Sequence, residues 1–225
     1  MPQQITLYAT DFSPYSHSVD IALLEAGAKY TRYEIDLMNK PSWFVAQVNP
    51  IAQVPAMTYG GPDVPPEQPS PDSIKLRESQ LLLQFVADLF PEARLIPEDP
   101  VLRAKVRFFM DIVRTKFVPA WYGHFRGGKP AEPFIGALEE LQALLPPSGF
   151  VVGEWSIADI AFVTILARAE IILELDHPLS GWSDGEGEMI IDMLHGHRFA
   201  RLAQYHRDLV ERPSFKSTFD NVNHR

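Results

Sequence analysis

The first 90 residues alternate between short apolar runs and amphipathic segments. A short apolar run at 5–8 and a segment rich in β-forming residues at 30–37 favour strands, and the segment between them carries apolar residues at helical spacing. Ser13 suits the N-cap of that helix, Pro14 its first turn, and Gly27 its C-terminal cap. This order predicts two parallel strands joined by a helix.

A second group of elements completes this part of the chain. A short helix is predicted after Pro41, a strand over 54–59, a stiff proline-rich loop over 60–73 and a last strand over 73–76. A further helix begins at Glu78, and its apolar residues share one face: Leu81, Leu82, Phe85, Val86 and Leu89. The last two strands should form an antiparallel hairpin, so the order is βαβ-ββα.

Helical periodicity dominates the rest of the chain. Prolines mark a linker over 91–100, and residues 183–188 read as a glycine- and acid-rich loop. Helices are predicted over 101–125, 131–145, 156–175 and 199–211. We therefore expect an α/β N-terminal domain over 1–90, with a thioredoxin-like order of elements, and an all-α C-terminal domain over 101–225.

Composition narrows the classes of function. Hydrophobic residues make up 46% of the 225, which is typical of a globular protein, and the net charge of −9 argues against nucleic acid as a partner. There is no cysteine, which excludes disulfides and a thiol nucleophile. The apolar segment 160–167 is too short to span a bilayer, and no secretory leader is evident, so we expect a cytoplasmic protein with no membrane partner.

A metal site is not expected. The pair His195 and His197 is two residues apart, a spacing that does not bring side chains together on a helix. No cysteine or carboxylate completes a ligand set beside them.

The turn around Ser13 is the first candidate for chemistry. Its hydroxyl could donate a hydrogen bond to an anion at the helix N-terminus, where the potential is positive. A bond to a charged group is worth about 1.5–3 kcal/mol. At 1.36 kcal/mol per unit, it would lower the pKa of a bound thiol by roughly one to two units. The alternative is that Ser13 only caps its own helix, and both interpretations remain open.

Two further motifs also allow both a structural and a ligand-binding interpretation. In Gln53-Val54-Pro55, the proline opens a strand, either as an ordinary entry residue or with a cis bond that leaves the Val54 backbone to pair with an extended peptide. In Glu78-Ser79, acidic and hydroxyl residues suit any first helical turn. They would also suit an α-amino and an α-carboxylate group of a ligand.

Together, these motifs resemble the cytosolic glutathione transferases over nearly the whole chain. Ser13-Pro14-Tyr15 resembles the Ser-Pro-Phe of the tau class and the Cys-Pro-Phe of the omega class. Residues 39–44 resemble the Asn-Lys-Pro-Glu-Trp run of omega enzymes, and Asn49-Pro50 and Val54-Pro55 follow at the expected spacing. The proline-rich segment 60–73 looks like the fungal-specific A class.

The helical half carries a matching motif of its own. Residues 153–160 resemble the helix-start box of the family, in which Ser156 and Asp159 cap each other. This box is expected to be structural.

The resemblance implies a role for each motif. Ser13 would face the sulfur of glutathione as the catalytic residue, Lys40 and Gln53 the glycine carboxylate, Val54 the cysteinyl backbone, and Glu78 and Ser79 the γ-glutamyl group. The implied glutathione-binding residues are Lys40, Gln53, Val54, Pro55, Glu78 and Ser79. The expected activity is conjugation of glutathione to small aromatic electrophiles, or peroxide reduction, in a detoxifying homodimer. The alternative is a ligandin that binds aromatic compounds and turns over little.

Two positions affect how strongly the glutathione thiolate could be stabilised. Ser18 stands where omega and tau sequences usually have arginine, so a positive charge near the first helix is absent. Tyr8 is a less favoured alternative to Ser13, because tyrosine-type transferases place a phenol at the end of the first strand.

An electrophile site is expected near Ser13 and on the long helix. Phe12 and Tyr15 flank the serine, and four more residues recur at three- and four-residue spacing. The expected ligand-site residues are Phe12, Tyr15, Met110, Arg114, Phe117 and Trp121. Such a stripe would suit a flat aromatic ligand, although aromatic residues on a helix more often form core.

Overall fold

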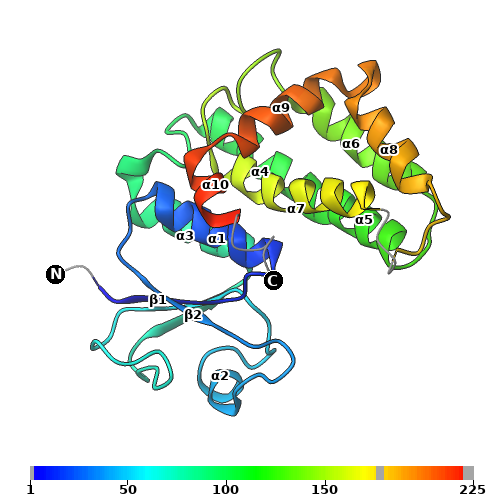
Figure 1. Ribbon diagram of the computed structural model, residues 1–225. Coiled ribbons are helices and arrows are strands. Elements are labelled where there is room, and N and C mark those ends of the chain that lie inside the picture. The colour runs from blue at the N-terminus through cyan, green and yellow to red at the C-terminus, as the bar shows by residue number, and fades with distance from the viewer. Residues whose placement is uncertain (1–2, 176–179, 220–225) are drawn as a thin grey trace. The chain divides into compact units, whose positions relative to one another are not determined.

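The structure is a computed structural model that describes residues 3–175 and 180–219. The chain forms two compact units, one of Met1–Leu95 with Pro213–Arg225 and one of Ile96–Arg212 (Figure 1).

The described residues of the first unit form a four-stranded sheet and four α-helices. Its elements are β1 (Ile5–Ala9), α1 (Pro14–Glu25), β2 (Thr31–Glu34), α2 (Ser42–Gln47), β3 (Ala56–Tyr59), β4 (Ile74–Arg77), α3 (Ser79–Leu89), a short 3-10 turn η1 (Pro91–Ala93) and α10 (Pro213–Phe219). The strand order is β2-β1-β3-β4; β1 is parallel to β2, and β3 is antiparallel to β1 and β4. The predicted βαβ-ββα order is confirmed.

The sheet has helices on both faces. Figure 1 shows α1 and α3 on one side and α2 on the other. The central strand β1 is buried along its whole length, which explains its unbroken apolar run. Tyr8 packs with Phe44 and Val48 of the α2 region, because alternate residues of a strand face opposite sides of the sheet.

The C-terminal helix α10 belongs to the first unit, whereas the sequence pattern assigned residues 101–225 to the helical domain. The ring of His17 on α1 packs at a tilt against Phe215 and stacks on Phe219, at centroid distances of 5.3 and 5.7 Å. Its Nε2 lies 2.7 Å from Thr218 Oγ1, and Ser214 Oγ donates a hydrogen bond to Glu25. These contacts with α1 explain the difference.

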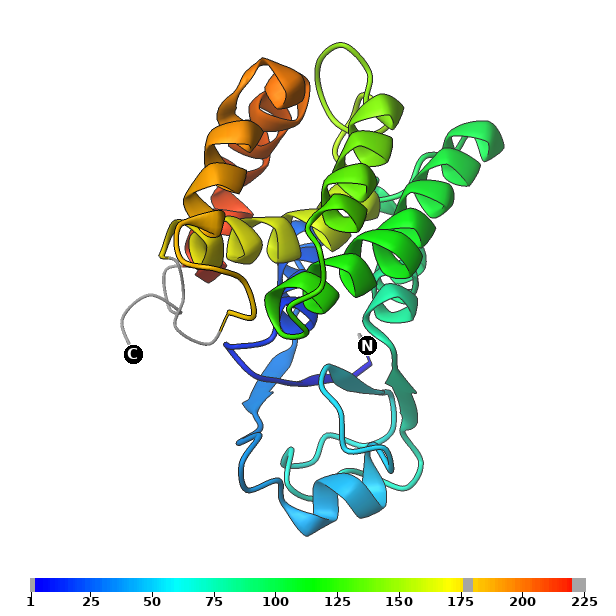
Figure 2. The same cartoon turned by 90° about the vertical axis from the view of Figure 1, so that its right-hand side faces the viewer.

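The second unit is built around one buried helix. Its elements are α4 (Pro100–Ile112), a π-helical turn η2 (Val113–Phe117), α5 (Val118–Phe125), α6 (Glu132–Leu144), α7 (Ile157–Glu174), α8 (Glu186–His195), η3 (His197–Phe199) and α9 (Ala200–Val210). Most of α7 is buried, and it packs against α4, α8 and α9 (Figure 2). A helix that is apolar on all sides is expected at such a central position.

Two features of this unit differ from the sequence expectation. The predicted helix over 101–125 contains a π turn at Val113–Phe117, shortly before Pro119, which has no backbone N–H to continue the α-helical ladder. The loop predicted over 183–188 ends early, because α8 begins at Glu186. Two glutamates in its first turn, Glu186 and Glu188, favour a helix N-terminus.

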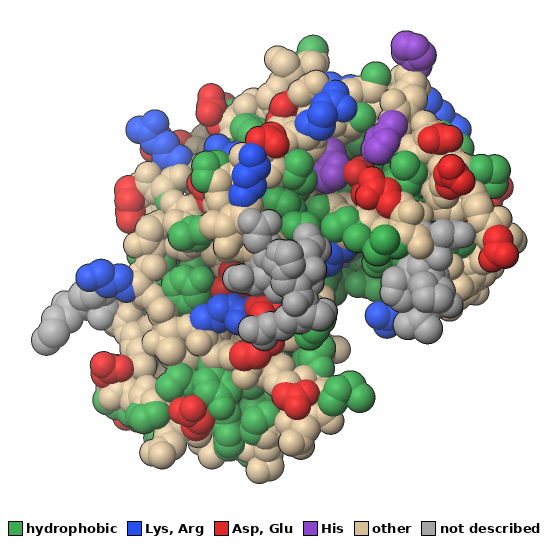
Figure 3. Space-filling model, viewed as in Figure 1, with side chains coloured by type: hydrophobic (Ala, Val, Ile, Leu, Met, Phe, Trp, Pro, Cys, Tyr) green, Lys and Arg blue, Asp and Glu red, His purple; other side chains and the backbone are tan. Residues whose placement is uncertain are grey.

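Surface charge is mixed on the face that Figure 3 shows, where acidic and basic side chains are interspersed. Among the described residues, no helix is long and apolar enough to cross a membrane.

Candidate functional site

Three sequence motifs of the first unit meet at one end of its sheet. In the register, Tyr8 of β1 lies opposite Ala56 of β3, and Ala56 lies opposite Arg77 of β4. The turn with Ser13 follows β1, Val54 and Pro55 precede β3, and Glu78 follows β4. Two inter-strand spacings amount to about 9–10 Å. An extended tripeptide spans about 10 Å, so this row has the length to hold one.

Ser13 is the N-cap of α1, and only 8% of it is exposed. Its Oγ accepts a hydrogen bond from Ser16 N at 3.1 Å, and its own amide donates to Thr10 O at 3.1 Å. Within the described part of the chain, no acceptor takes the hydroxyl proton of Ser13. The two sequence interpretations are therefore compatible: the oxygen caps the helix, and the proton can be donated to a ligand.

Backbone amides of the first turn of α1 are largely used by the helix itself. Ser16 N bonds Ser13 Oγ, His17 N bonds Ser13 O, and Pro14 has no N–H. The hydroxyl of Ser13 is thus a more important donor than the sequence suggested. The dipole of the 12-residue helix adds positive potential at the same end.

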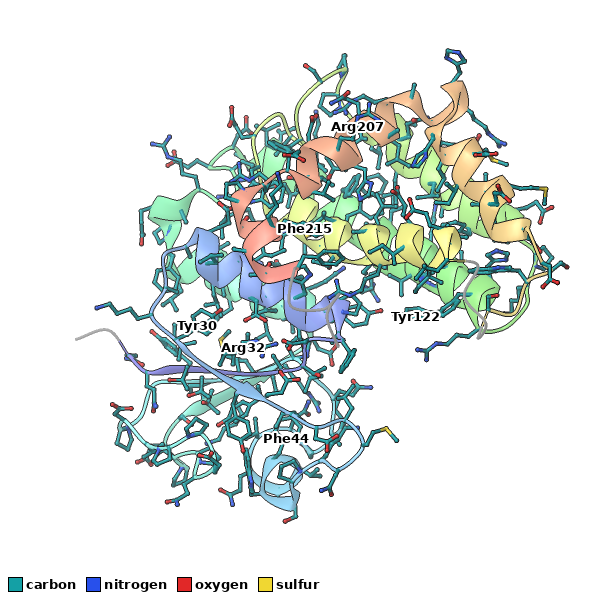
Figure 4. The ribbon with its side chains drawn as sticks, viewed as in Figure 1. Tyr30, Arg32, Phe44, Tyr122, Arg207 and Phe215 are labelled. Carbon is teal, nitrogen blue, oxygen red and sulfur yellow. The ribbon has the colours of Figure 1, made fainter. Side chains whose placement is uncertain are left out.

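A charged network holds the turn that leads to Ser13. Glu34 Oε1 accepts from Thr10 Oγ1 at 2.7 Å and from Asp11 N at 3.2 Å. Arg32, labelled in Figure 4, bonds Glu34 and Asp11 at 2.7 Å each and Asp20 at 3.0 Å. The network ties β2, the turn and α1 together, so the position of the turn is well defined.

The positive charge of Arg32 is matched by carboxylates. Burial lowers the pKa of Arg32, but the charges and hydrogen bonds of Asp20, Glu34 and Asp11 outweigh this and raise it. With three carboxylates around one guanidinium, the network supplies no net positive charge. Ser18 does not supply one either, since its hydroxyl donates to Tyr15 O at 2.8 Å.

Tyr8 is committed to the fold. The side chain is fully buried, and its hydroxyl donates to Pro66 O at 2.8 Å in the proline-rich loop. Its ring packs against Tyr33, Trp43 and Phe44. Burial raises the pKa of Tyr8 from 10.0 to about 12. This phenol is neutral at physiological pH and engaged elsewhere, which disfavours it as an alternative to Ser13.

The Val54–Pro55 bond is cis, which is one of the two geometries predicted for this motif. Pro55 is buried and Val54 half-buried, whereas the side chain of Gln53 is exposed. Lys40 is exposed in the segment between β2 and α2.

Glu78 has an unusual backbone. Its φ of +72° and ψ of 108° lie outside the regions that non-glycine residues normally occupy, and the residue is exposed. Ser79 is the first residue of α3. Such conformations cost about 1–3 kcal/mol and cluster at ligand sites, and an ordinary helix start does not require one.

The ligand-site residues predicted from the sequence differ widely in exposure. Phe12 is 66% exposed and Tyr15 half-buried, on either side of Ser13. Arg114 in the second unit has 61% of its side chain exposed and pairs with Asp111 at 2.8 Å.

Met110, Phe117 and Trp121 are instead buried in the core of the second unit. Phe117 packs against Phe134 and Phe162, as the core interpretation of the stripe expects. The π turn changes the helical register, which accounts for the separation of Arg114 from these residues. Contact of a ligand with any of the four predicted residues of the long helix, Arg114 included, stays a prediction.

Comparison with known proteins decides the family. Residues 7–94 match the sequence family described as "Glutathione S-transferase, N-terminal domain". The crystal structure of glutathione transferase Omega 1C from Trametes versicolor is 47% identical, with a TM-score of 0.95 over 98% of this chain and 94% of that one. This chain belongs to the glutathione transferase family. The predicted omega resemblance of the transferase is confirmed.

The chain is also similar to two further glutathione transferases. Omega 2S from Trametes versicolor, solved in complex with 2,4-dihydroxybenzophenone, is 48% identical, with a TM-score of 0.91 over 99% of this chain and 94% of that one. A probable glutathione S-transferase of Solanum tuberosum is 31% identical over 130 residues, which cover 57% of this chain and 54% of that protein. The match thus spans about half the length of the potato protein.

Sequence reasoning missed two groups of residues that shape this end of the transferase. The first group consists of Asp11, Arg32 and Glu34, which form no recognisable motif in the sequence. They come together because β1 pairs with β2 in a register that places Ala9 opposite Glu34. Asn49 was recognised only as part of the Asn49-Pro50 motif and was given no role in the site. In the structure it is 1% exposed and hydrogen-bonded to the Val54 loop.

No metal centre is evident in the described part of the transferase, where no group of three or more His, Cys, Asp or Glu residues could hold an ion. His195 lies 3.9 Å from the single carboxylate of Glu170.

Proposed function

We propose that this transferase binds glutathione at the end of the sheet and uses the Ser13 hydroxyl to stabilise its thiolate. The observation that carries the proposal is the position of Ser13: its hydroxyl proton has no acceptor within the described chain, at one end of a row long enough for a tripeptide.

Each part of the tripeptide has a matching group. The Glu78 carboxylate pairs with the α-amino group of the γ-glutamyl residue, and Ser79 at the start of α3 binds its α-carboxylate. The backbone of Val54, beside Pro55, pairs with the cysteinyl residue. Lys40 attracts the glycine carboxylate at the other end, and Gln53 assists it.

The thiolate then attacks an electrophilic carbon and forms a carbon–sulfur bond, either displacing a leaving group such as the chloride of chlorodinitrobenzene or adding to the carbon of an isothiocyanate, whose nitrogen takes up a proton. In peroxide reduction, two glutathione molecules are oxidised to their disulfide while the O–O bond is cleaved to an alcohol and water. Donation from Ser13 is worth about 1.5–3 kcal/mol, which corresponds to roughly one to two units in the thiol pKa. Serine cannot form a mixed disulfide with glutathione, so thiol-exchange activity is expected to be negligible. We place the activity in cytoplasmic detoxification by a homodimer.

The experiment compares Ser13→Ala with Ser13→Thr, which keeps a hydroxyl. Thiolate absorbance of bound glutathione reports its pKa, and conjugation of chlorodinitrobenzene or an isothiocyanate reports the rate. Ser13→Ala should raise the thiol pKa by roughly one to two units and lower kcat/KM at neutral pH by about 10–100-fold. Ser13→Thr should lie much closer to the wild type. An unchanged thiol pKa in Ser13→Ala would refute the role of the hydroxyl.

A ligandin function is the second candidate. It is favoured by the omega 2S structure from Trametes versicolor, whose bound ligand is an aromatic phenol. Tight binding of 2,4-dihydroxybenzophenone, together with equally slow conjugation by wild type and Ser13→Ala, would favour this function over catalysis.

A further inference from the structure

Asn49 closes the loop that leads into the Val54 segment. The residue is buried, with 1% of its surface exposed, and lies two positions after the end of α2. Its Nδ2 donates to Gln53 O at 2.8 Å, and its Oδ1 accepts from Ile51 N at 3.3 Å. Its carbonyl also accepts from Ala52 N at 2.9 Å. One side chain thus bonds two backbone groups of a five-residue loop.

The bond to Gln53 O controls the orientation of the Val54 amide. The carbonyl of Gln53 and the N–H of Val54 belong to the same peptide unit, which is planar. In a trans unit these two groups point in opposite directions. Holding the oxygen toward Asn49 therefore directs the Val54 N–H away from it, and rotation of this peptide would break the bond.

The loop needs such a restraint. Ala52 has a φ of +55°, in the left-handed region that alanine rarely adopts. Its neighbours must therefore hold the loop in shape. Asn49 provides hydrogen bonds on both sides of Ala52, to Ile51 N and to Gln53 O.

Asn49 also lies beside the other half of the proposed site. Its Oδ1 is 3.5 Å from Nη1 of Arg77, the residue that precedes Glu78. A single carboxamide therefore contacts both the loop before β3 and the end of β4.

We propose that Asn49 is a positioning residue for glutathione: its carboxamide aims the Val54 amide at the cysteinyl residue and keeps that loop in register with Glu78. This inference rests on the proposed function, because it concerns the same tripeptide. It assigns Asn49 no contact with the substrate and no part in the chemical step.

The test is Asn49→Asp, with Gln47→Glu as a control that makes the same amide-to-carboxylate change at an exposed position of the same unit. The aspartate keeps the size and the acceptor atoms but replaces the donor to Gln53 O with a second oxygen, which that carbonyl repels. Calorimetry should show glutathione binding weakened by about tenfold in Asn49→Asp, a typical effect of one lost hydrogen bond. The control should bind like the wild type.

Kinetics separate positioning from catalysis. Asn49→Asp should raise the KM for glutathione about as much as the Kd and leave kcat within about twofold, because Ser13 is untouched. Binding of 2,4-dihydroxybenzophenone should not change. Unweakened binding of glutathione by a folded Asn49→Asp protein, or a loss confined to kcat, would overturn the proposal.

A measurement on the unmutated protein covers the case in which Asn49→Asp does not fold. In protein labelled with nitrogen-15 valine, saturating glutathione should shift the Val54 amide resonance and slow its hydrogen exchange. An unaffected Val54 amide in a protein that binds glutathione would refute the inference. Absence of glutathione binding by the wild type would instead refute the proposed function.

Discussion

Two serines, one in each unit, cap helices in nearly the same way but differ in their hydroxyl proton. Ser13 accepts from Ser16 N at 3.1 Å, and Ser156 accepts from Ala158 N at 3.3 Å. Ser156 also donates to Asp159 Oδ2 at 2.8 Å. Three residues after Ser13 the chain has Ser16 instead of a carboxylate. A serine cap is thus closed when a neighbour takes its proton, and open to a ligand when none does.

Asp159 makes the closed cap part of the core. Besides the Ser156 hydroxyl, this buried carboxylate accepts from Ser156 N at 2.8 Å, Val151 N at 3.0 Å and Tyr205 Oη at 2.7 Å. The capping box expected from the sequence is confirmed. The open cap of α1 has Ser16 where the closed cap has this buried carboxylate. A network of charged residues instead holds the turn before α1.

The largest effect on the comparison should come from Asp159→Ala. The change leaves several buried donors unpaired, so it should lower the free energy of unfolding by about 3–5 kcal/mol. The melting temperature should fall by roughly 10 °C, measured by calorimetry. Asp111→Ala is the control, since this exposed carboxylate pairs only at the surface and should matter by less than about 1 kcal/mol. Equal effects of the two changes would show that the closed cap is not a structural centre.

A smaller effect is expected from Ser156→Ala. Loss of the N-cap should lower the free energy of unfolding by about 1–2 kcal/mol, measured by urea unfolding. The thiol pKa of bound glutathione should not change, because this proton is used inside the second unit. Ser13→Ala should cost similar cap energy while raising that pKa. If both variants shifted the thiol pKa alike, the distinction between open and closed caps would fail.

Tyr8→Phe should give the smallest change in stability, and it compares the Tyr8 hydroxyl with the Ser13 hydroxyl of the same unit. The Tyr8 hydroxyl is committed to Pro66 O, so its loss should lower the free energy of unfolding near neutral pH by about 1 kcal/mol and leave the thiol pKa unchanged.

The pH dependence of Tyr8→Phe has a defined sign. Folding raises the pKa of Tyr8 from 10.0 to about 12, so its stabilising contribution is complete below pH 10 and is lost as the pH rises through about 12. The stability of the wild type relative to Tyr8→Phe should therefore fall over this interval in urea unfolding, and the difference should change sign once the fall exceeds the roughly 1 kcal/mol of the hydrogen bond. A constant difference would contradict the raised pKa.

Much of the first unit could be predicted because its signals are local. Strand runs, the Ser13 cap and the proline entering β3 all depend on a few adjacent residues. The C-terminal helix α10 was missed because it is seven residues long and packs on His17, about 200 positions away in sequence. Helix α8 was not among the predicted helices, because Gly185 and its polar neighbours favour a loop when read alone.

The features of the candidate site also divide into those set by nearby residues and those set by long-range contacts. Nearby residues in the chain were sufficient to predict the motifs around Ser13, Val54 and Glu78, and the likeness to glutathione transferases, because caps and turns are short-range features. Long-range contacts settled that Tyr8 is engaged by Pro66, that Trp121 is core and that Asn49 holds the Val54 loop. The physical reason is that the partner of a buried polar group, and the depth of its burial, depend on residues that only the folded chain brings together.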